Sequence, residues 1–278
     1  MKRQLSALFL GLFSLIFFAD ELRAQEILDN AATYRAEYTY RYKKDSTKSG
    51  YYKDTYYLDI CKSGHSYFYS RARQYKDSIQ KARLSEGKHY TDVFASTRTL
   101  KNGLGWYVDK RFADGTYSYV TSLISSVYRA DEKLEMPQWK LYQDTLTIAG
   151  YLCHKATAKV AGREWEAWYT LQIPINDGPW LLWGLPGLIL HAKDSNAYFR
   201  FTCENVGELS EQYHVLLSAD LNRVKTMKIK ELLKAELMCE LDFEEYEKLY
   251  EGISISYSSP PLRKWYYIPL FLMPDVKL

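Results

Sequence analysis

The sequence has no motif that identifies a reaction, and each absence removes a class of enzyme. Its 278 residues contain no HExxH zinc pair, no GxSxG nucleophile turn and no CxxC metal or redox pair. Charge of one sign is not in excess either, because 37 Lys and Arg against 34 Asp and Glu give a net charge of +3. So small a charge gives no electrostatic reason to bind nucleic acid or an anionic membrane. We therefore expect no nucleic-acid partner, and we assign no catalytic, cofactor-binding or metal-binding residues.

Long apolar runs are missing after the first two dozen residues. Lys2 and Arg3 precede an apolar run, Leu5–Ala19, and the small residue Ala24 follows it. This layout is typical of a secretory signal peptide, and the run is shorter than the roughly 20 residues that cross a bilayer. The alternative is an uncleaved membrane anchor. We expect a signal peptide at 1–24 that is cleaved after Ala24, and a periplasmic or secreted chain without a membrane span.

Cysteine is scarce. Removal of residues 1–24 leaves 254 residues (278 − 24), a length that suits a single β-rich domain at 25–278. An oxidising compartment permits disulfides, and a domain of this size can equally hold its cysteines as buried thiols. The sequence leaves both states open for Cys61, Cys153, Cys203 and Cys239.

Aromatic residues, in contrast, are abundant: 26 Tyr, 11 Phe and 7 Trp. Tyrosine favours the pleated, half-buried surface of a β-strand. Between Tyr34 and Tyr42 apolar and charged residues alternate, and the segment from Trp165 to Ile173 alternates in the same way. A period of two places one set of side chains on each face of a strand. We predict a mainly β, β-rich α+β fold, an antiparallel curved sheet or open barrel with C-terminal helices.

Helical patterns occur in two places. Apolar residues at helical spacing between 229 and 237, followed by the capping box of Asp242 and Glu245, predict a helical segment at about 226–251. A shorter helix is predicted between Arg71 and Gly87, with an apolar face made of Tyr75, Ile79 and Ala82.

The most apolar segment of the remaining chain is also the one with most helix and strand breakers: GPWLLWGLPGLILHA, from Gly178 to Ala192. Leu185-Pro186-Gly187-Leu188 fits a type II turn, in which Gly187 takes a positive φ. Gly184 permits a close approach or an unusual dihedral angle. The turn leads into a buried strand.

The alternative for this segment is a phosphate-binding loop. Such a loop needs a following helix and usually a Lys with Ser or Thr, and the sequence has neither here. We therefore predict a structural loop in which the tryptophans cover the core. Its residues are Trp180, Trp183, Gly184, Leu185, Pro186, Gly187, Leu188 and Ile189.

Residues 184–189 spell GLPGLI, and the sequence here resembles the GLPGLI family of exported bacterial proteins, also called Porph_ging. The segments GYLCHKA at 150–156, GREWEAWYT at 162–170 and IPINDGPWLLWGLPGLIL at 173–190 are similar to the same family. The resemblance covers about 146–206. It implies a Gram-negative secreted or cell-envelope protein, often encoded near outer-membrane transport systems, with an envelope protein as its partner. It brings no established activity and no catalytic residues.

Three short patterns could still carry chemistry. Cys153, His154, His191 and Cys203 fall on neighbouring predicted strands and would form a metal site if they converged. Cys153 and His154 point to opposite faces of their strand, however, which favours partly buried side chains in a sheet. The run HAKDS, residues 191–195, holds the three residue types of a catalytic triad.

The third pattern is a pair of carboxylates. Glu164 and Glu166 lie two residues apart on one strand face. A glycosidase can use a carboxylate pair, but a solvated sheet face is the commoner explanation.

Two functions remain open. The first is a non-catalytic scaffold or binding protein of the cell envelope, associated with outer-membrane or secretion systems. The alternative is a periplasmic hydrolase or metal-dependent enzyme with an unrecognised site. The absence of any catalytic motif favours the first, and no cofactor is expected. A deep pocket with converging His, Asp or Cys would favour the enzyme, whereas a broad apolar groove would favour binding.

Overall fold

A computed structural model describes residues 31–124, 126–214, 224–252 and 269–271. The expected signal peptide lies outside the described residues. The described chain builds one twelve-stranded sheet whose order is β12-β6-β5-β4-β3-β2-β1-β11-β10-β9-β8-β7. All neighbours are antiparallel except β12, which pairs with β6 in parallel.

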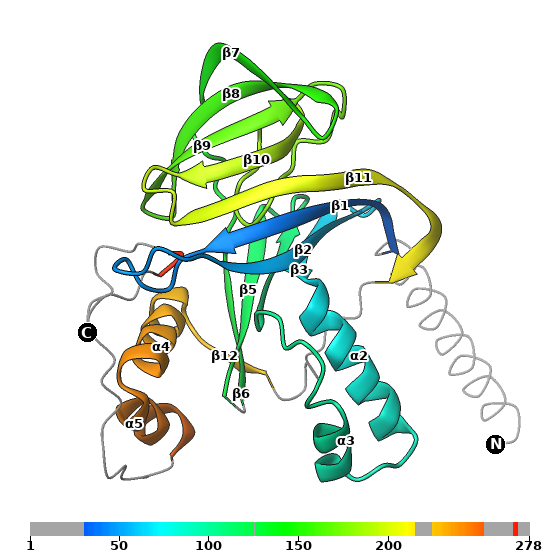
Figure 1. The fold of residues 1–278 in the computed structure, drawn as a ribbon, viewed down its shortest axis with the longest axis vertical. Helices are drawn as coiled ribbons and strands as arrows, with labels where there is room; N and C mark the ends of the chain where they lie inside the picture. The colour runs from blue at the N-terminus through cyan, green and yellow to red at the C-terminus, as the bar shows by residue number, and fades with distance from the viewer. Residues whose placement is uncertain (1–30, 125, 215–223, 253–268, 272–278) are drawn as a thin grey trace, which may run out of the picture.

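The strands are β1 (Ala31–Tyr42), β2 (Tyr52–Cys61), β3 (His65–Ser70), β4 (Trp106–Arg111), β5 (Thr116–Leu123), β6 (Ser126–Lys133), β7 (Lys140–Ile148), β8 (Tyr151–Val160), β9 (Arg163–Thr170), β10 (Leu188–Asp194), β11 (Phe199–His214) and β12 (Lys225–Thr226). The sheet is strongly curved, so that β5 and β6 run across the direction of β1 and β11 (Figure 1). The prediction of a mainly β, curved antiparallel sheet is confirmed.

The alternating aromatic residues build the core, as predicted. Tyr38 and Tyr40 of β1 are at most 2% exposed. The Tyr40 ring stacks on Phe201 of β11 with centroids 4.6 Å apart, and it meets Tyr56 of β2 edge to face at 5.6 Å. Aromatic pairs across neighbouring strands are the unit that stabilises a sheet. In the segment from Trp165 to Ile173, Trp165, Ala167 and Ile173 are buried, but β9 ends at Thr170 and Leu171 is exposed.

The predicted helix after β3 is present as α2 (Arg71–Ser85), and a second helix, α3 (Tyr90–Ser96), follows it. Both extend away from the sheet (Figure 1). The predicted apolar face of α2 is wrong: Tyr75 is 57% exposed, and the residue of α2 that is buried is Asp77. The Arg73 guanidinium donates to the Asp77 carboxylate at 2.8 Å, so an ion pair holds the inner side of α2.

The C-terminal helical segment is confirmed as α4 (Ile229–Leu241), α5 (Phe243–Tyr246) and the π-helical turn η2 (Glu247–Glu251). Asp242 caps α5 by accepting from the Glu245 N–H at 3.2 Å. Ile229, Leu232 and Leu233 of α4 are buried. This helix contacts β5 and β6 and covers that end of the core face. Within the described ranges, no helix has the length and apolar character that a membrane crossing requires.

Candidate functional site

The GLPGLI segment packs inside the curve of the sheet. It lies between β9 and β10, and its side chains at Trp180, Leu182 and Leu185 are at most 1% exposed. Its backbone hydrogen-bonds to itself, for example from the Gly184 N–H to the Asn176 carbonyl at 3.0 Å. The Tyr38 hydroxyl of β1 donates to the Ile189 carbonyl at 2.6 Å. The loop therefore fills core space, and its polar backbone groups are satisfied there.

The predicted type II turn is wrong. Gly187 does not take a positive φ, and its N–H donates to the Leu185 carbonyl at 2.7 Å, which closes a shorter turn around Pro186. A Cβ on Gly187 would lie 1.9 Å from the Thr170 carbonyl oxygen. Glycine is needed there because two stretches of backbone touch. The positive φ of this loop falls instead on Gly184, at 86°, and on Trp180, at 55°.

The two tryptophans of the loop have different environments. Trp180 is fully buried, with its ring 5.4 Å from that of Trp165 and 5.0 Å from that of Phe271. Trp183 is half-buried, and its indole N–H donates to the Glu135 carbonyl at 3.2 Å. Both rings pack against the core: Trp180 lies inside it, whereas Trp183 covers its margin, with its ring 5.2 Å from that of Phe112.

A buried ion pair connects this loop to the distant strand β4. Lys110 is 0% exposed and donates to the Asp177 carboxylate and to the Gly178 carbonyl, the latter at 2.7 Å. Burial lowers the pKa of Lys110, while Asp177 acts in the opposite direction. Asp177 also accepts from the Gly178 N–H at 2.7 Å. Both of these contacts use Oδ1 of Asp177, and its Oδ2 is buried without a hydrogen-bond partner among the described residues. Since the two charges are buried and pair with each other, the pair organises the loop.

The four residues considered as metal ligands do not converge. Cys153 and Cys203 are buried free thiols, and burial raises their pKa values to about 11 and about 12. His191 shares a hydrogen bond with Thr202 at 3.0 Å, and His154 stacks at 5.9 Å on Tyr169. In the described part of the chain, no three His, Cys, Asp or Glu side chains are grouped so as to hold a metal ion.

The HAKDS run does not form a triad. Asp194 is 1% exposed and faces the core, where Arg163 donates to it at 3.0 Å. It also accepts from the Phe199 N–H at 2.8 Å. His191 lies three residues earlier, on the opposite face of β10. The Asp and His therefore cannot act on the same group.

The two carboxylates of the predicted pair lie on the outward face of β9 and line the same open cavity. Glu166 forms ion pairs with Lys155 at 3.1 Å and with Lys193 at 3.2 Å. Glu164 is exposed near the start of β9. The arrangement is a solvated ion-pair cluster on a sheet surface.

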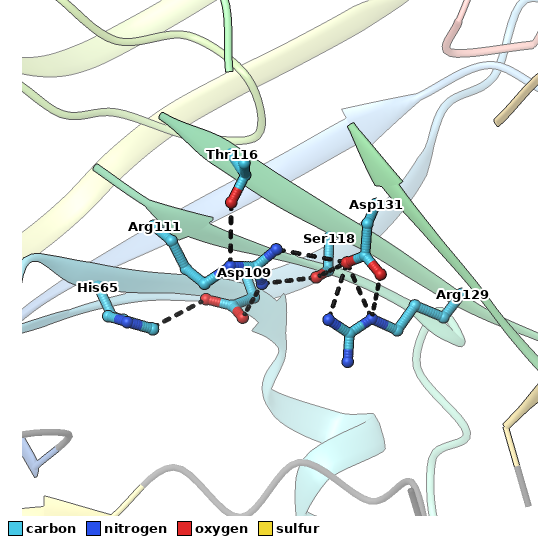
Figure 2. A network of polar contacts seen from close by, with 7 residues as sticks. All are labelled: His65, Asp109, Arg111, Thr116, Ser118, Arg129 and Asp131. Carbon is cyan, nitrogen blue, oxygen red and sulfur yellow. Dashed lines mark hydrogen bonds and ion pairs between the residues drawn. The ribbon is translucent and has the colours of Figure 1, made fainter. Parts of the chain in front are cut away.

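A polar network on the outer side of β3 to β6 also contains His, Asp and Ser (Figure 2). His65 lies 3.5 Å from Asp109, but the Ser118 hydroxyl donates to Asp131 at 2.5 Å and not to the histidine. Arg111 bridges the two aspartates, at 2.7 Å to Asp109 and 3.3 Å to Asp131. A serine held by a carboxylate and an arginine has no base to activate it, so this network is structural.

In the part of the chain that the structure describes, a cavity brings polar groups together with aromatic side chains. It has a volume of about 230 Å³ and lies between the core face of the sheet and α4. Tyr40, Trp106, Tyr119, Phe199 and Phe271 supply its aromatic walls. The Tyr119 and Phe271 rings meet edge to face at 5.0 Å, and those of Tyr40 and Trp106 at 5.9 Å. Such a wall offers apolar surface and ring faces to a small ligand.

Two carboxylates of α4 face this cavity. Glu236 accepts from the Tyr119 hydroxyl at 2.8 Å and bonds to Thr121, and burial raises its pKa to about 7. Glu240 lies one helical turn later and forms an ion pair with Lys44 at 3.2 Å. A carboxyl group that titrates near neutrality can donate or accept a hydrogen bond at physiological pH.

Sequence reasoning missed both the cavity and the buried pair. The charged residues of α4, Glu236 among them, resemble an ordinary solvent-exposed helix face. The cavity forms only where β1, β4, β5 and α4 come together. A signal for Lys110 does exist: it follows Val108 by two residues, in the alternating set of β4 that faces the core. A lysine in an inward position predicts a buried partner.

No curated protein matches the chain in sequence. Two solved structures are similar to it in fold: "Structure of PNGF-II in C2 space group", with 14% identity and a TM-score of 0.50, and "Structure of PNGF-II in P21 space group", with 15% identity and a TM-score of 0.49. Each comparison covers 76% of this chain but 34% of the other, so the chain spans about a third of those proteins. At this identity the likeness concerns the fold alone. Residues 161–191 match the model of the Porph_ging family, described as a protein of unknown function, and this confirms the resemblance in the segment that carries the motif.

Proposed function

We propose that the protein is an exported, non-catalytic binding protein of the cell envelope that holds a small ligand in the aromatic cavity beside α4. The observation that carries this proposal is the combination of aromatic walls with the two carboxylates Glu236 and Glu240. Ring faces pack against apolar surface of a ligand, and carboxylates accept hydrogen bonds from hydroxyl or ammonium groups. The favoured ligand is therefore a small neutral or cationic molecule with one apolar face.

Native mass spectrometry of protein purified from its own cells tests this proposal. We expect wild-type protein to carry a bound small molecule that is lost in Trp106→Ala and in Glu236→Gln. Tyr75→Ala is the matched control, because Tyr75 is an exposed aromatic residue on α2, outside the cavity. Equal occupancy in all four proteins would place the ligand elsewhere, and the absence of any bound molecule would argue against the proposal.

A hydrolase is the second candidate, and Glu236 is the observation that favours it. A carboxyl group with a pKa of about 7 is suited to general acid or base catalysis. Glu240 would have to be the second group, and Lys44 already neutralises it. Hydrolysis of a panel of fluorogenic glycosides and esters, measured for wild type and Glu236→Gln, separates the two candidates. Turnover that disappears in Glu236→Gln would replace the binding proposal.

Export is a separate part of the proposal, supported by the basic, apolar and small-residue layout of the first 24 residues. N-terminal sequencing of protein from the periplasmic fraction or the medium is expected to begin at Gln25. Recovery of the uncleaved chain in the inner membrane would contradict export by cleavage, and would favour an anchor.

A further inference from the structure

A row of four cations crosses the outer face of the sheet. Lys53 of β2 pairs directly with Arg41 of β1, Arg41 with Arg200 of β11, and Arg200 with Lys193 of β10. Neighbouring strands lie about 4.8 Å apart, so the four Cα atoms span roughly 14 Å. We call Lys53, Arg41, Arg200 and Lys193 the cationic row. It lies on the face opposite the aromatic cavity, because the adjacent residues Tyr40 and Phe199 point into the core.

The cationic row is poorly neutralised by the described residues. Like charges placed directly opposite one another destabilise a sheet. Among the residues that the structure describes, no carboxylate forms an ion pair with Lys53, Arg41 or Arg200, and Lys193 shares Glu166 with Lys155. The positive potential of the row also acts on His191, two residues before Lys193 on β10. The pKa of His191 is lowered to about 4, first by burial and then by the charges of Arg200 and Lys193. An anion bound at the row would remove this repulsion.

Arg200 supplies a second, independent observation. Its Nε atom is buried and has no hydrogen-bond partner in the described structure. Buried donors in proteins almost always have a partner, so an unpartnered guanidinium nitrogen indicates a missing acceptor. Arg200 and Lys193 line an open cavity of about 430 Å³, together with Thr157, Glu166 and Ser195. The residue with the unmet donor therefore lines a cavity that can admit a ligand.

The chemistry of the row and its cavity defines the ligand. A guanidinium fork and a lysine bind oxyanions such as carboxylate or sulfate. The hydroxyls and the carboxylates Glu164 and Glu166 of the cavity can bond to the hydroxyl groups of a sugar. A nucleic-acid site normally comes with a strongly basic domain, whereas this chain carries +3. The cationic row, about 14 Å long, is longer than a single small anion, so its ligand should be an extended molecule with several acid groups.

We propose that the cationic row and the adjoining cavity bind an acidic polysaccharide, with its acid groups on Arg41, Arg200 and Lys193. Binding of a heparin-derived hexasaccharide to the full chain, measured by calorimetry at two salt concentrations, tests this. We expect measurable affinity that falls as salt rises, because the contacts are ionic. Arg200→Gln and Arg41→Gln should each weaken binding about tenfold, the usual effect of losing one charge-assisted hydrogen bond.

Lys81→Gln is the matched control, since it removes an exposed positive charge from α2, away from the row. It should leave the affinity unchanged, and Arg200→Lys should bind better than Arg200→Gln. Each variant is compared with wild type in thermal melts so that loss of folding is not read as loss of binding. Unchanged affinity in correctly folded Arg200→Gln and Arg41→Gln would overturn the proposal. Equal affinity for inorganic phosphate, or for a DNA oligonucleotide of the same charge, would overturn the assignment to a polysaccharide.

Discussion

Gly187 shows that a glycine can be required for space alone. Its φ is not positive, yet a Cβ there would lie 1.9 Å from the Thr170 carbonyl oxygen, a rigid backbone atom. We expect Gly187→Ala to lower the free energy of unfolding by about 3 kcal/mol or more, the upper part of the range for overpacked sites. Gly50→Ala is the control, because nothing lies within 4 Å of its added Cβ. Chemical denaturation measures both, and equal stability of the two variants would contradict the close approach.

The two tryptophans of the GLPGLI segment should differ in their contribution to stability. Trp180→Ala removes a fully buried ring and should cost roughly 3–5 kcal/mol, as for other buried aromatics. Trp183→Ala removes a half-buried ring that packs against Phe112 at the margin of the core and donates one hydrogen bond to Glu135, so its cost should be smaller. Thermal and denaturant melts of the two variants compare them. A larger loss for Trp183→Ala would show that the burial of the two rings is misassigned.

Glu236 makes stability depend on pH. Burial raises its pKa in the folded protein to about 7, above the ordinary glutamate value of 4.5, so the folded state binds the proton more tightly. Stability from this group is therefore complete below about pH 4.5 and is lost as pH rises towards 7, by at most about 3 kcal/mol. Denaturation at pH 5 and pH 8 should show that wild type loses more stability over this interval than Glu236→Gln. Equal losses in the two proteins would exclude this titration.

Among the secondary-structure elements, the α2–α3 pair should be less protected than the central strands of the sheet. Asp77 is the buried residue of α2 and Val93 that of α3, and polar contacts such as the Gln80–Thr97 hydrogen bond at 2.8 Å connect them. Few buried apolar groups mean a low free energy of local opening. Hydrogen exchange should therefore be faster in α2 and α3 than in β1, which lies between β2 and β11. Protection in α2 equal to that in β1 would contradict this.

At the scale of the molecule, the Lys110–Asp177 pair joins distant parts of the sheet. Lys110 belongs to β4, while Asp177 belongs to the loop that precedes β10, five places away in the strand order. Lys110→Met leaves Asp177 buried without its partner and should cost about 3–5 kcal/mol. The double variant Lys110→Met with Asp177→Asn removes both charges and should recover part of that loss. Unfolding monitored by circular dichroism gives both values, and no recovery in the double variant would argue against an uncompensated charge as the cause.

The strand character of the alternating segments and the positions of α2 and the C-terminal helices could be predicted from the sequence, because each depends on a local pattern. Alternation at Tyr34–Tyr42 and Trp165–Tyr169 selects a strand with one buried face, because the side-chain period of a strand is two. The spacing of Ile229, Leu232 and Leu233 selects α4 in the same way. The family motif could also be recognised, since it is a contiguous run of residues.

The contacts that those elements make depend on how the whole sheet is assembled. The period of α2 predicts an apolar face, but no element of the described chain covers Tyr75, which is exposed. The space that Gly187 needs is set by Thr170, a backbone group on a separate strand. The cavity, the Lys110–Asp177 pair and the cationic row each join residues from elements far apart in the chain. A sequence pattern reports how a segment folds locally, whereas these sites depend on the curvature and order of the whole sheet.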